Sequence, residues 1–401
     1  MRHIKKRSQA ALSIIIDGSL TFLTLTDGTV LAHRFFIIRS HQMTITIQCP
    51  QESSQKIQSN RTLLSSPTPS SPSSSFSNGS IHPRQISAEA EAAMEDSSRV
   101  DPQLLLSHKF PEGTYTYTER DVALYALGVG ACAHDAVDAD ELKYVHHESG
   151  LRFIQVLPTF AALFSLGAVP LDKDIPGLRF DPRLLLHGQQ YIELYRPLPS
   201  RATLKNKASV VGLHDKGKAA VLETEVRCFD EGSGELLCMN RITTYLRGAG
   251  GFSESSKPYS YSNYPPNQVS AIRIPKEQPF SVFEDQTQPS QALLYRLSGD
   301  YNPLHSDPTF AKVAGFSRPI LHGLCTLGFA VRAIIKRICR GDSSMVKNIL
   351  GRFLLHVYPG ETLMTEMWIE GSRVIYQTKV KERNRAVLSG YMDLHRLASS
   401  L

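Results

Sequence analysis

The sequence predicts an α+β fold made of two copies of one unit, in which a helix packs on a curved antiparallel sheet. In both halves of the chain, stretches of helical composition precede four strand-like runs. Letters repeat as well: residues 123–130 (ALYALGVG) resemble 293–300 (LLYRLSGD), and 195–204 (YRPLPSRATL) resemble 357–363 (VYPGETL). A duplication is the economical explanation, and two such units would bury one shared core.

The first 93 residues are predicted to be a disordered, low-complexity extension outside this fold. Residues 51–88 are rich in Ser and Pro and too poor in apolar side chains to form a core. Residues 1–48 begin with MRHIKKR, as a targeting leader would, but the alternation in 20–26 (LTFLTLT) is strand-like rather than helical. Met94 is a second candidate start, so it stays open whether the extension belongs to the mature protein.

Composition excludes several classes of protein. The formal net charge is +6, of which residues 1–93 carry +4, so the remainder is too nearly neutral for a nucleic-acid-binding surface. The six cysteines form no C-x-x-C pair, which argues against a structural zinc site or a disulfide framework and favours a reducing compartment. No charge-free apolar run reaches about 18 residues, so no membrane span is expected.

The N-terminal domain is predicted over residues 94–250. A helix over 118–130 begins at a capping threonine and ends at glycines. Residues 152–166 are apolar around a proline and indicate a second helix, or a strand that leads into one. Turn-forming residues separate four predicted strands, at 190–195, 203–214, 218–230 and 236–247. Residues 251–275, rich in Gly, Ser, Pro and Tyr, are predicted to be a linker.

The C-terminal domain is predicted over residues 276–401, with the same order of elements. A helix over 289–297 is followed by a polar loop and by a long apolar helix over 322–340. Four predicted strands follow, at 348–357, 361–369, 373–383 and 385–394.

The polar loop of this second half holds Asp300, Asn302 and His305 within six residues. Aspartate and histidine can work as an acid/base pair near neutral pH. Gly323 follows at the start of the long helix, where free N–H groups favour developing negative charge and a glycine lets a ligand approach the backbone. An alternative is that Asp300 and His305 only stabilise a turn. The first half has Gly130 in place of Asp300, so only one copy carries this set.

Several separated motifs resemble the hydratase 2 family of MaoC-like, double hot-dog proteins. They are LSGDYNPLHSDPTFAKVAGFSRPILHGLCTLGFA, GRFLLHVYPGETLMTEMW, LPTF, LLHGQQYIELYRPLP and HDKGK, and the resemblance covers about residues 100–401. It implies two tandem hot-dog folds, each a long central helix wrapped by an antiparallel sheet. It also implies reversible hydration of trans-2-enoyl-CoA to (3R)-3-hydroxyacyl-CoA, without a metal or an organic cofactor.

The resemblance assigns roles to individual residues. Asp300 and His305 match the catalytic pair, Asn302 matches a residue that helps to position the water, and the Gly323 N–H matches the donor to the thioester oxygen. We expect His305 to be the base and Asp300 the acid, with the reverse assignment left open. The residues expected to contact the substrate are His187, Gly188, Lys216, Tyr301, Pro303, Leu304 and Phe353. Taken alone, Lys216 would be a solvated turn lysine, His187-Gly188 a strand entry and Phe353 a core residue.

Location, partners and alternatives follow from the same resemblance. The chain ends Ser399-Ser400-Leu401, which is similar to the peroxisomal S-K-L signal, so we expect a peroxisomal import receptor as a partner. A mitochondrial or plastid address is the competing interpretation of the basic leader. The family implies a homodimer and a role in fatty-acid β-oxidation, including degradation of unsaturated acids. Without a G-x-G-x-x-G motif, a stand-alone hydratase is expected. The alternatives are an acyl-CoA thioesterase and a non-catalytic acyl-CoA-binding protein.

Overall fold

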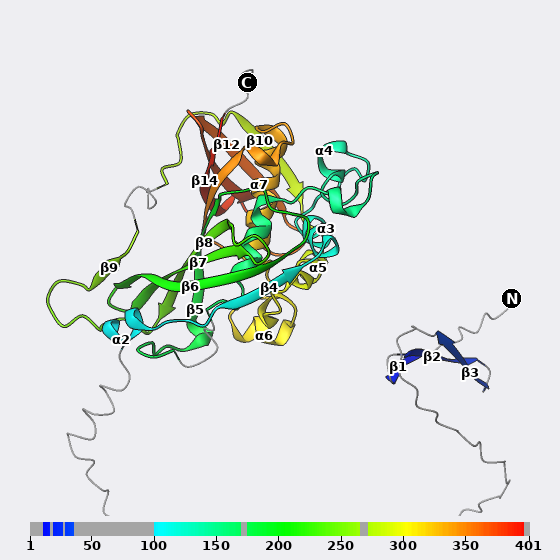
Figure 1. Cartoon of the computed structure of the whole chain (residues 1–401), viewed down its shortest axis with the longest axis horizontal. Helices are drawn as coiled ribbons and strands as arrows, with labels where there is room; N and C mark the ends of the chain where they lie inside the picture. The colour runs from blue at the N-terminus through cyan, green and yellow to red at the C-terminus, as the bar shows by residue number, and fades with distance from the viewer. Residues whose placement is uncertain are drawn as a thin grey trace, which may run out of the picture. The chain divides into compact units, whose positions relative to one another are not determined.

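The computed structural model describes residues 11–16, 19–26, 29–35, 100–169, 175–264 and 272–396 (Figure 1). The chain divides into two compact units, residues 1–82 and 83–401. Within the described residues, no helix is both long and apolar enough to cross a membrane.

The first unit contains a three-stranded antiparallel sheet, formed by β1 (Ala11–Ile16), β2 (Ser19–Thr26) and β3 (Thr29–Phe35) in that order. The alternation in residues 20–26 is confirmed as part of β2. The sequence between the paired strand ends is Asp-Gly in both cases, which is the pair that tight hairpin turns favour. These strands lie within the extension predicted over residues 1–93. Residues 1–10, 17–18, 27–28 and 36–93 of that extension lie outside the described residues, and its disorder stays a prediction.

The second unit begins with an N-terminal half of short helices and long strands. Its main elements are α2 (Pro102–Ser107), β4 (Gly113–Tyr117), α3 (Glu119–Gly128), α4 (Ala139–Leu142), the 3-10 helix η2 (Pro158–Ser165), β5 (Leu185–Leu194), β6 (Ala202–Asp215), β7 (Ala219–Asp230), β8 (Leu236–Arg247) and β9 (Ser260–Ser262).

The C-terminal half repeats this order with a longer central helix. Its main elements are β10 (Ser281–Gln286), α5 (Gln291–Tyr295), the 3-10 helices η5 (Arg296–Ser298) and η6 (Pro303–His305), α6 (Pro308–Val313), α7 (Gly323–Arg337), the 3-10 helix η7 (Ser343–Met345), β11 (Val346–Phe353), β12 (Thr362–Glu370), β13 (Arg373–Val380) and β14 (Arg385–Leu394).

One antiparallel sheet runs through both halves. Its strand order is β10-β12-β13-β14-β11-β5-β8-β7-β6-β4, with β9 paired to β6. From the centre outwards, each half therefore has the same order: its first long strand, then its fourth, third and second, then a short edge strand. The halves join where β11 pairs with β5, for example through Leu350 opposite Tyr191. This symmetry is what a duplication of one unit produces.

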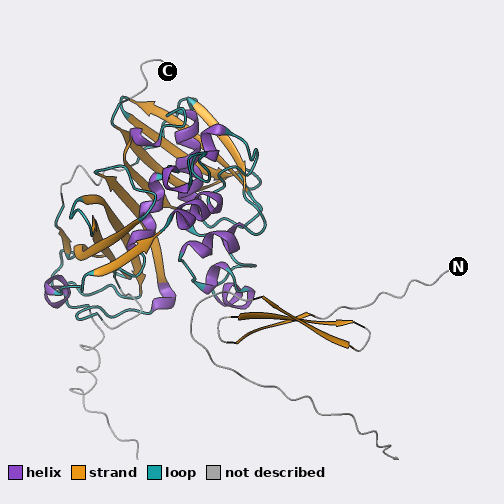
Figure 2. Cartoon of the chain, turned by 45° about the vertical axis from the view of Figure 1, so that its right-hand side comes forward, coloured by secondary structure: helices purple, strands orange, loops and turns teal. Residues whose placement is uncertain are grey.

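Most of the helices lie together beside the strands (Figure 2), and α3, η2, α5 and α7 share one apolar core that takes residues from both halves. α7 packs against η2, β10 and β12, while η2 also packs against β5 and β8. α3 packs against α5, so Tyr125 and Tyr295, which occupy matching places in the repeat, have ring centroids 5.9 Å apart. Each half is thus a helical segment wrapped by an antiparallel sheet, and the prediction of two tandem hot-dog folds is confirmed.

Three details differ from the predictions. The central helix of the first half is only the eight-residue η2, because Pro158 fixes its start and Gly167, with φ +74°, follows its end. The edge strands β4 and β10 were not predicted, although the burial of their side chains alternates. The predicted linker contains β9, which pairs with β6. All eight predicted strands are found, with the largest shift at β5, predicted from residue 190 and found from Leu185.

Candidate active site

The polar loop of the second half is an ordered segment between η5 and α7. Gly299, with φ +117°, ends η5 and turns the chain towards Asp300. Asn302 caps η6, since its Oδ1 accepts a hydrogen bond of 3.0 Å from Leu304 N. Asn302 N in turn donates to Asp300 Oδ1 over 3.3 Å. These bonds fix the carboxylate of Asp300 and place His305 at the end of η6.

The ring of His305 is held in one tautomer. Its Nδ1 lies 2.8 Å from the carbonyl oxygen of Ile320, and a carbonyl can only accept, so Nδ1 carries the proton. Nε2 is then left with a free lone pair. Burial lowers the pKa of His305, against the opposing effects of the Ile320 bond and the Asp300 charge. The ring is therefore neutral at pH 7 and can accept a proton at Nε2.

His322 joins this pair, although it was expected only as the first residue of the helix predicted over 322–340. The carboxylate of Asp300 and ring nitrogens of His305 and His322 all lie within 4.8 Å of one another. The two imidazoles stack, with centroids 3.7 Å apart. His322 Nε2 donates to the carbonyl oxygen of Asp300 over 3.1 Å. The sequence signal that pointed to His322 was its position directly before the glycine at the start of the predicted helix.

Gly323 is the first residue of α7, and it is exposed. Its N–H belongs to the first turn, where backbone donors have no partner within the helix. A Cβ at this position would lie 3.0 Å from Phe353 Cδ1 at the end of β11, so only glycine leaves this approach open. The N–H of this exposed glycine, at a helix start and directly after His322, can stabilise an oxyanion.

The first half contributes His187 from β5. Its ring meets that of Phe353 edge-on, with centroids 4.9 Å apart, and its Nε2 bonds the carbonyl oxygen of Gln189 over 3.1 Å. Burial lowers the pKa of His187 to about 4, and the charge of Asp300 acts in the opposite direction. The site is therefore composite, because it lies where β5 of one half begins and β11 of the other ends.

Two family models match almost the whole of the second unit. Residues 115–248 match the MFE-2 hydratase 2 N-terminal domain, and residues 271–390 match the MaoC like domain. The chain is 69% identical over 304 residues to "Enoyl-CoA hydratase 2, peroxisomal" of Arabidopsis thaliana, an alignment that covers 76% of this chain and 98% of that protein. The chain belongs to the hydratase 2 family of MaoC-like proteins.

Two further relatives agree with the hydratase 2 assignment. "Peroxisomal multifunctional enzyme type 2" of Mus musculus is 41% identical over 292 residues, which are 72% of this chain and 38% of that protein. Among solved structures, a MaoC-like dehydratase from Phytophthora capsici superposes with a TM-score of 0.64 and 33% identity, covering 75% of this chain and all of that one.

The remaining hydratase 2 residues expected at the substrate divide into two groups. Pro303 and Leu304 form η6, and Tyr301 before them is exposed under the guanidinium of Arg296, 5.0 Å from its ring. Gly188 and Lys216 have no contact with Asp300 or His305 among the described residues. Gly188 is buried against Tyr245, whose ring would lie 2.4 Å from an added Cβ. Lys216 is exposed in the turn between β6 and β7.

Asp300, His305 and His322 are also close enough to be considered as metal ligands. Lone pairs of an imidazole lie in the plane of its ring, so two rings stacked at 3.7 Å, with 29° between their planes, converge poorly on one ion. The expectation of a reaction without a metal stays a prediction. The targeting residues Ser399, Ser400 and Leu401 lie outside the described residues.

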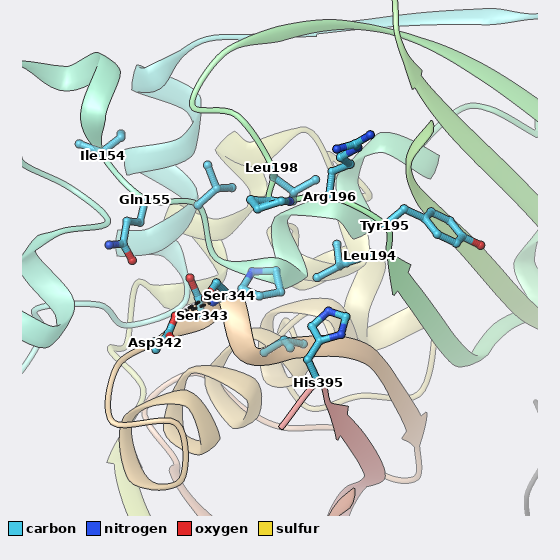
Figure 3. Close-up of a pocket in the computed structure, with 14 residues that line it drawn as sticks. Ile154, Gln155, Leu194, Tyr195, Arg196, Leu198, Asp342, Ser343, Ser344 and His395 are labelled. Atoms are coloured by element: carbon cyan, nitrogen blue, oxygen red, sulfur yellow. Dashed lines mark hydrogen bonds between the residues drawn. The ribbon is translucent and has the colours of Figure 1, made fainter. Parts of the chain in front are cut away.

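The duplicated fold has a second place equivalent to this hydratase 2 site, where η2 and β11 begin and β5 ends. A cavity of about 410 Å³ lies there, lined among others by Gln155, Arg196 and His395 (Figure 3). The helix in this place begins with Pro158, which has no N–H to offer. Gly130 stands where the other half has Asp300. The equivalent place therefore lacks both the oxyanion donor and the acid.

Proposed function

We propose that the chain is a (3R)-specific enoyl-CoA hydratase, which adds water reversibly to trans-2-enoyl-CoA and gives (3R)-3-hydroxyacyl-CoA. One observation carries the proposal: the Asp300 carboxyl and a ring nitrogen of His305 lie within 4.8 Å of one another, and Gly323 begins α7 directly after His322, the third member of that cluster. The name of the Arabidopsis relative, an enoyl-CoA hydratase 2, supports the same reaction.

The residues divide the addition of water between them. His305 Nε2 takes a proton from water while the hydroxide forms a bond to C3 and the C2=C3 electrons move to the thioester oxygen. The Gly323 N–H stabilises that enolate oxygen; removing one such donor costs roughly 10²–10³ in rate in other enzymes. Asp300, acting as the acid, then delivers a proton to C2. The proton gained by His305 passes to the Asp300 carboxylate, which restores both groups, so each turnover adds one H to C2 and one OH to C3.

Other residues orient the reactants. Asn302 uses its Oδ1 to cap η6, which leaves its side-chain NH₂ to hold the attacking water. His187 and Phe353 form one wall beside the acid/base pair, and they shield the developing charge from bulk water. Tyr301, Pro303 and Leu304 lie along the same loop and contact the thioester arm. Gly188 follows His187 in β5 and contacts the thioester, and Lys216 attracts the CoA phosphates.

The hydratase works in the peroxisome, in β-oxidation of fatty acids, including unsaturated ones. The name of the Arabidopsis relative and the C-terminal Ser-Ser-Leu both support this location. A reporter-tagged full chain should co-localise with a peroxisomal marker, and removal of Leu401 should leave it in the cytosol. Peroxisomal import without Leu401 would move the signal elsewhere in the chain. We also propose a homodimer, to be checked by light scattering on the purified full chain.

The activity is tested with the purified full chain and trans-2-decenoyl-CoA. Loss of enoyl absorbance measures hydration, a stereospecific dehydrogenase reports the configuration of the alcohol, and a thiol reagent detects free CoA. A 3R alcohol without free CoA supports the proposal. Free CoA would favour a thioesterase, and tight binding without either product would favour an acyl-CoA-binding protein.

A further inference from the structure

His322 contacts three parts of the site at once. It precedes Gly323 directly in the chain, so its backbone leads into the helix that presents the oxyanion donor. Its ring stacks on the ring of His305, with 3.7 Å between centroids and 29° between planes. Its Nε2 donates to the backbone carbonyl oxygen of Asp300 over 3.1 Å. Within the described residues, these three contacts link the base, the acid and the oxyanion donor through one side chain.

The ring of His322 is not explained by packing alone. It is 1% exposed, and its Nδ1 has no hydrogen-bond partner within the described residues, which is unfavourable for a buried polar atom. An aromatic ring without nitrogens would fill the same space without leaving an atom unpaired. The one favourable polar contact of the side chain is the Nε2–H bond to Asp300. Burial, and next the neighbouring His305, lower the pKa of His322 to about 3, so the ring stays neutral.

The ring of His322 also contacts a rigid element. The ring of Tyr295 in α5 has its centroid 4.8 Å away, with 50° between the planes, and Tyr295 is fully buried in the shared core. His322 therefore contacts both Tyr295 and His305. These ring contacts connect the polar loop, which is half exposed, to the helices of both halves.

We propose that His322 is a positioning residue for the hydration reaction, which holds the Asp300 backbone by its Nε2–H and the His305 ring by stacking. The inference rests on the proposed function, because it assigns His322 a part in that reaction through Asp300 and His305. His322 does not exchange a proton with the substrate. It keeps the acid and the base in register with the Gly323 N–H, where displacement of about 1 Å can cost ~10² in rate.

Two substitutions separate the two contacts of His322. His322→Phe keeps a stacked ring but removes the donor to Asp300, and His322→Gln keeps an N–H donor but removes the stack. Cys325→Ala is the matched control, since Cys325 is equally buried in the same turn of α7 and contacts neither Asp300 nor His305 in the described structure. Melting temperatures identify variants that fold, and His322→Gln carries the test if His322→Phe does not fold.

The expected result is a split between kcat and KM. Both His322 variants should lose about 10- to 100-fold in kcat, with KM within about threefold of wild type, because the binding wall is intact and only the reacting groups shift. Cys325→Ala should keep the wild-type kcat. Wild-type kcat in both His322 variants, or an equal loss in Cys325→Ala, would overturn the proposal.

A second readout does not depend on catalysis. Backbone amides of residues 300–302, 304 and 305 should exchange hydrogen about tenfold or more faster in the His322 variants than in wild type and Cys325→Ala, because the loop loses its attachment. If the wild-type chain did not hydrate any enoyl-CoA, the proposed function would fail and amide exchange alone would decide the positioning role. Unchanged exchange in both His322 variants would then reject it.

Discussion

His305 donates its Nδ1–H to the backbone carbonyl oxygen of Ile320 over 2.8 Å. Ile320 lies fifteen residues further along the chain, three before Gly323, so this bond closes the polar loop against the start of α7. The same bond decides the tautomer of the ring. The acid/base pair and the oxyanion donor are therefore held by one short, cross-linked segment.

Asp300→Asn should lower kcat by about 10²–10⁴ without unfolding the chain. An amide cannot deliver the proton to C2, but its Oδ1 can still accept the bond from Asn302 N. Hydration kinetics and circular dichroism check both parts. Asp307→Asn is the control, because Asp307 lies in the same loop and caps α6 through Thr309 N. Equal losses in the two variants would mean that the loop, rather than the acid, was damaged.

The rate of hydration should begin to fall only when the pH is below about 6.5, which is the usual pKa of histidine. Burial lowers the pKa of His305, so its Nε2 stays free throughout the neutral range and is protonated only in more acidic solution. The pH profile of kcat/KM for the full chain measures this limb. A limb that begins above pH 7 would show that His305 is not the free base.

Stability should also fall with acid, in a predictable direction. Burial lowers the pKa of His187 to about 4 and that of His322 to about 3, so both rings bind a proton more readily in the unfolded chain. The contribution of these two rings to the free energy of unfolding is therefore fully present above pH ~6.5 and is lost progressively towards pH 4. Denaturation at pH 7.5 and 5.5 measures the change while carboxylates stay ionised. His187→Phe should reduce the pH dependence; an unchanged dependence would contradict the assignment.

Gly323→Ala should reduce kcat/KM by about 10- to 100-fold. A small displacement of the Gly323 N–H is enough to misplace the donor relative to the oxyanion. The added Cβ would lie 3.0 Å from the ring of Phe353, so one of the two must move. Phe353→Leu in the same chain removes that crowding and should recover part of the loss. If the double variant were no better than Gly323→Ala alone, the contact with Phe353 would not be the cause.

Arg332→Met should destabilise the fold by about 3–5 kcal/mol. Arg332 is buried in the middle of α7, where it pairs with Glu141 of α4 and with Asp285 of β10 and donates to Val129 O over 3.0 Å. Removing the guanidinium leaves the buried carboxylates of Glu141 and Asp285 with only their more exposed partners, Lys336 at 3.2 Å and His134 at 2.8 Å. Denaturant unfolding gives the value.

The control for Arg332→Met is Arg196→Met, which breaks an exposed pair with Glu235 at 2.6 Å. Surface pairs of this kind contribute about 0–1 kcal/mol. Equal losses in the two variants would show that burial does not decide the effect.

The sequence predicted the fold where hydrophobic periodicity and turns were clear. Gly371 and Asn384 fall in the gaps between the strands predicted at 361–369, 373–383 and 385–394, and both have positive φ in the turns that flank β13. It missed β4 and β10 because each has only five or six residues, with polar side chains on its exposed face. The stabilising partners of these strands, β6 and β12, are about 85 residues away, and no local pattern reveals them.

The candidate site was predictable where its residues are close in the chain. Asp300, Asn302 and His305 share one loop, so their spacing alone suggested acid/base chemistry. The stack of His322 on His305 could not be predicted, because the distance between them depends on how the loop folds back on α7. The contact of His187 with Phe353 depends on the register between β5 and β11, which local sequence does not determine.

The pairing of β5 with β11 has a consequence for how the active site responds to dilution. If the two hot-dog units were separate chains, the site would exist only while two copies met, and its amount would fall with concentration. Here both units are tethered in one chain and joined by a ladder from Gln189 to Glu193, so the encounter is intramolecular. Every folded molecule then carries one complete site, however few molecules a compartment holds.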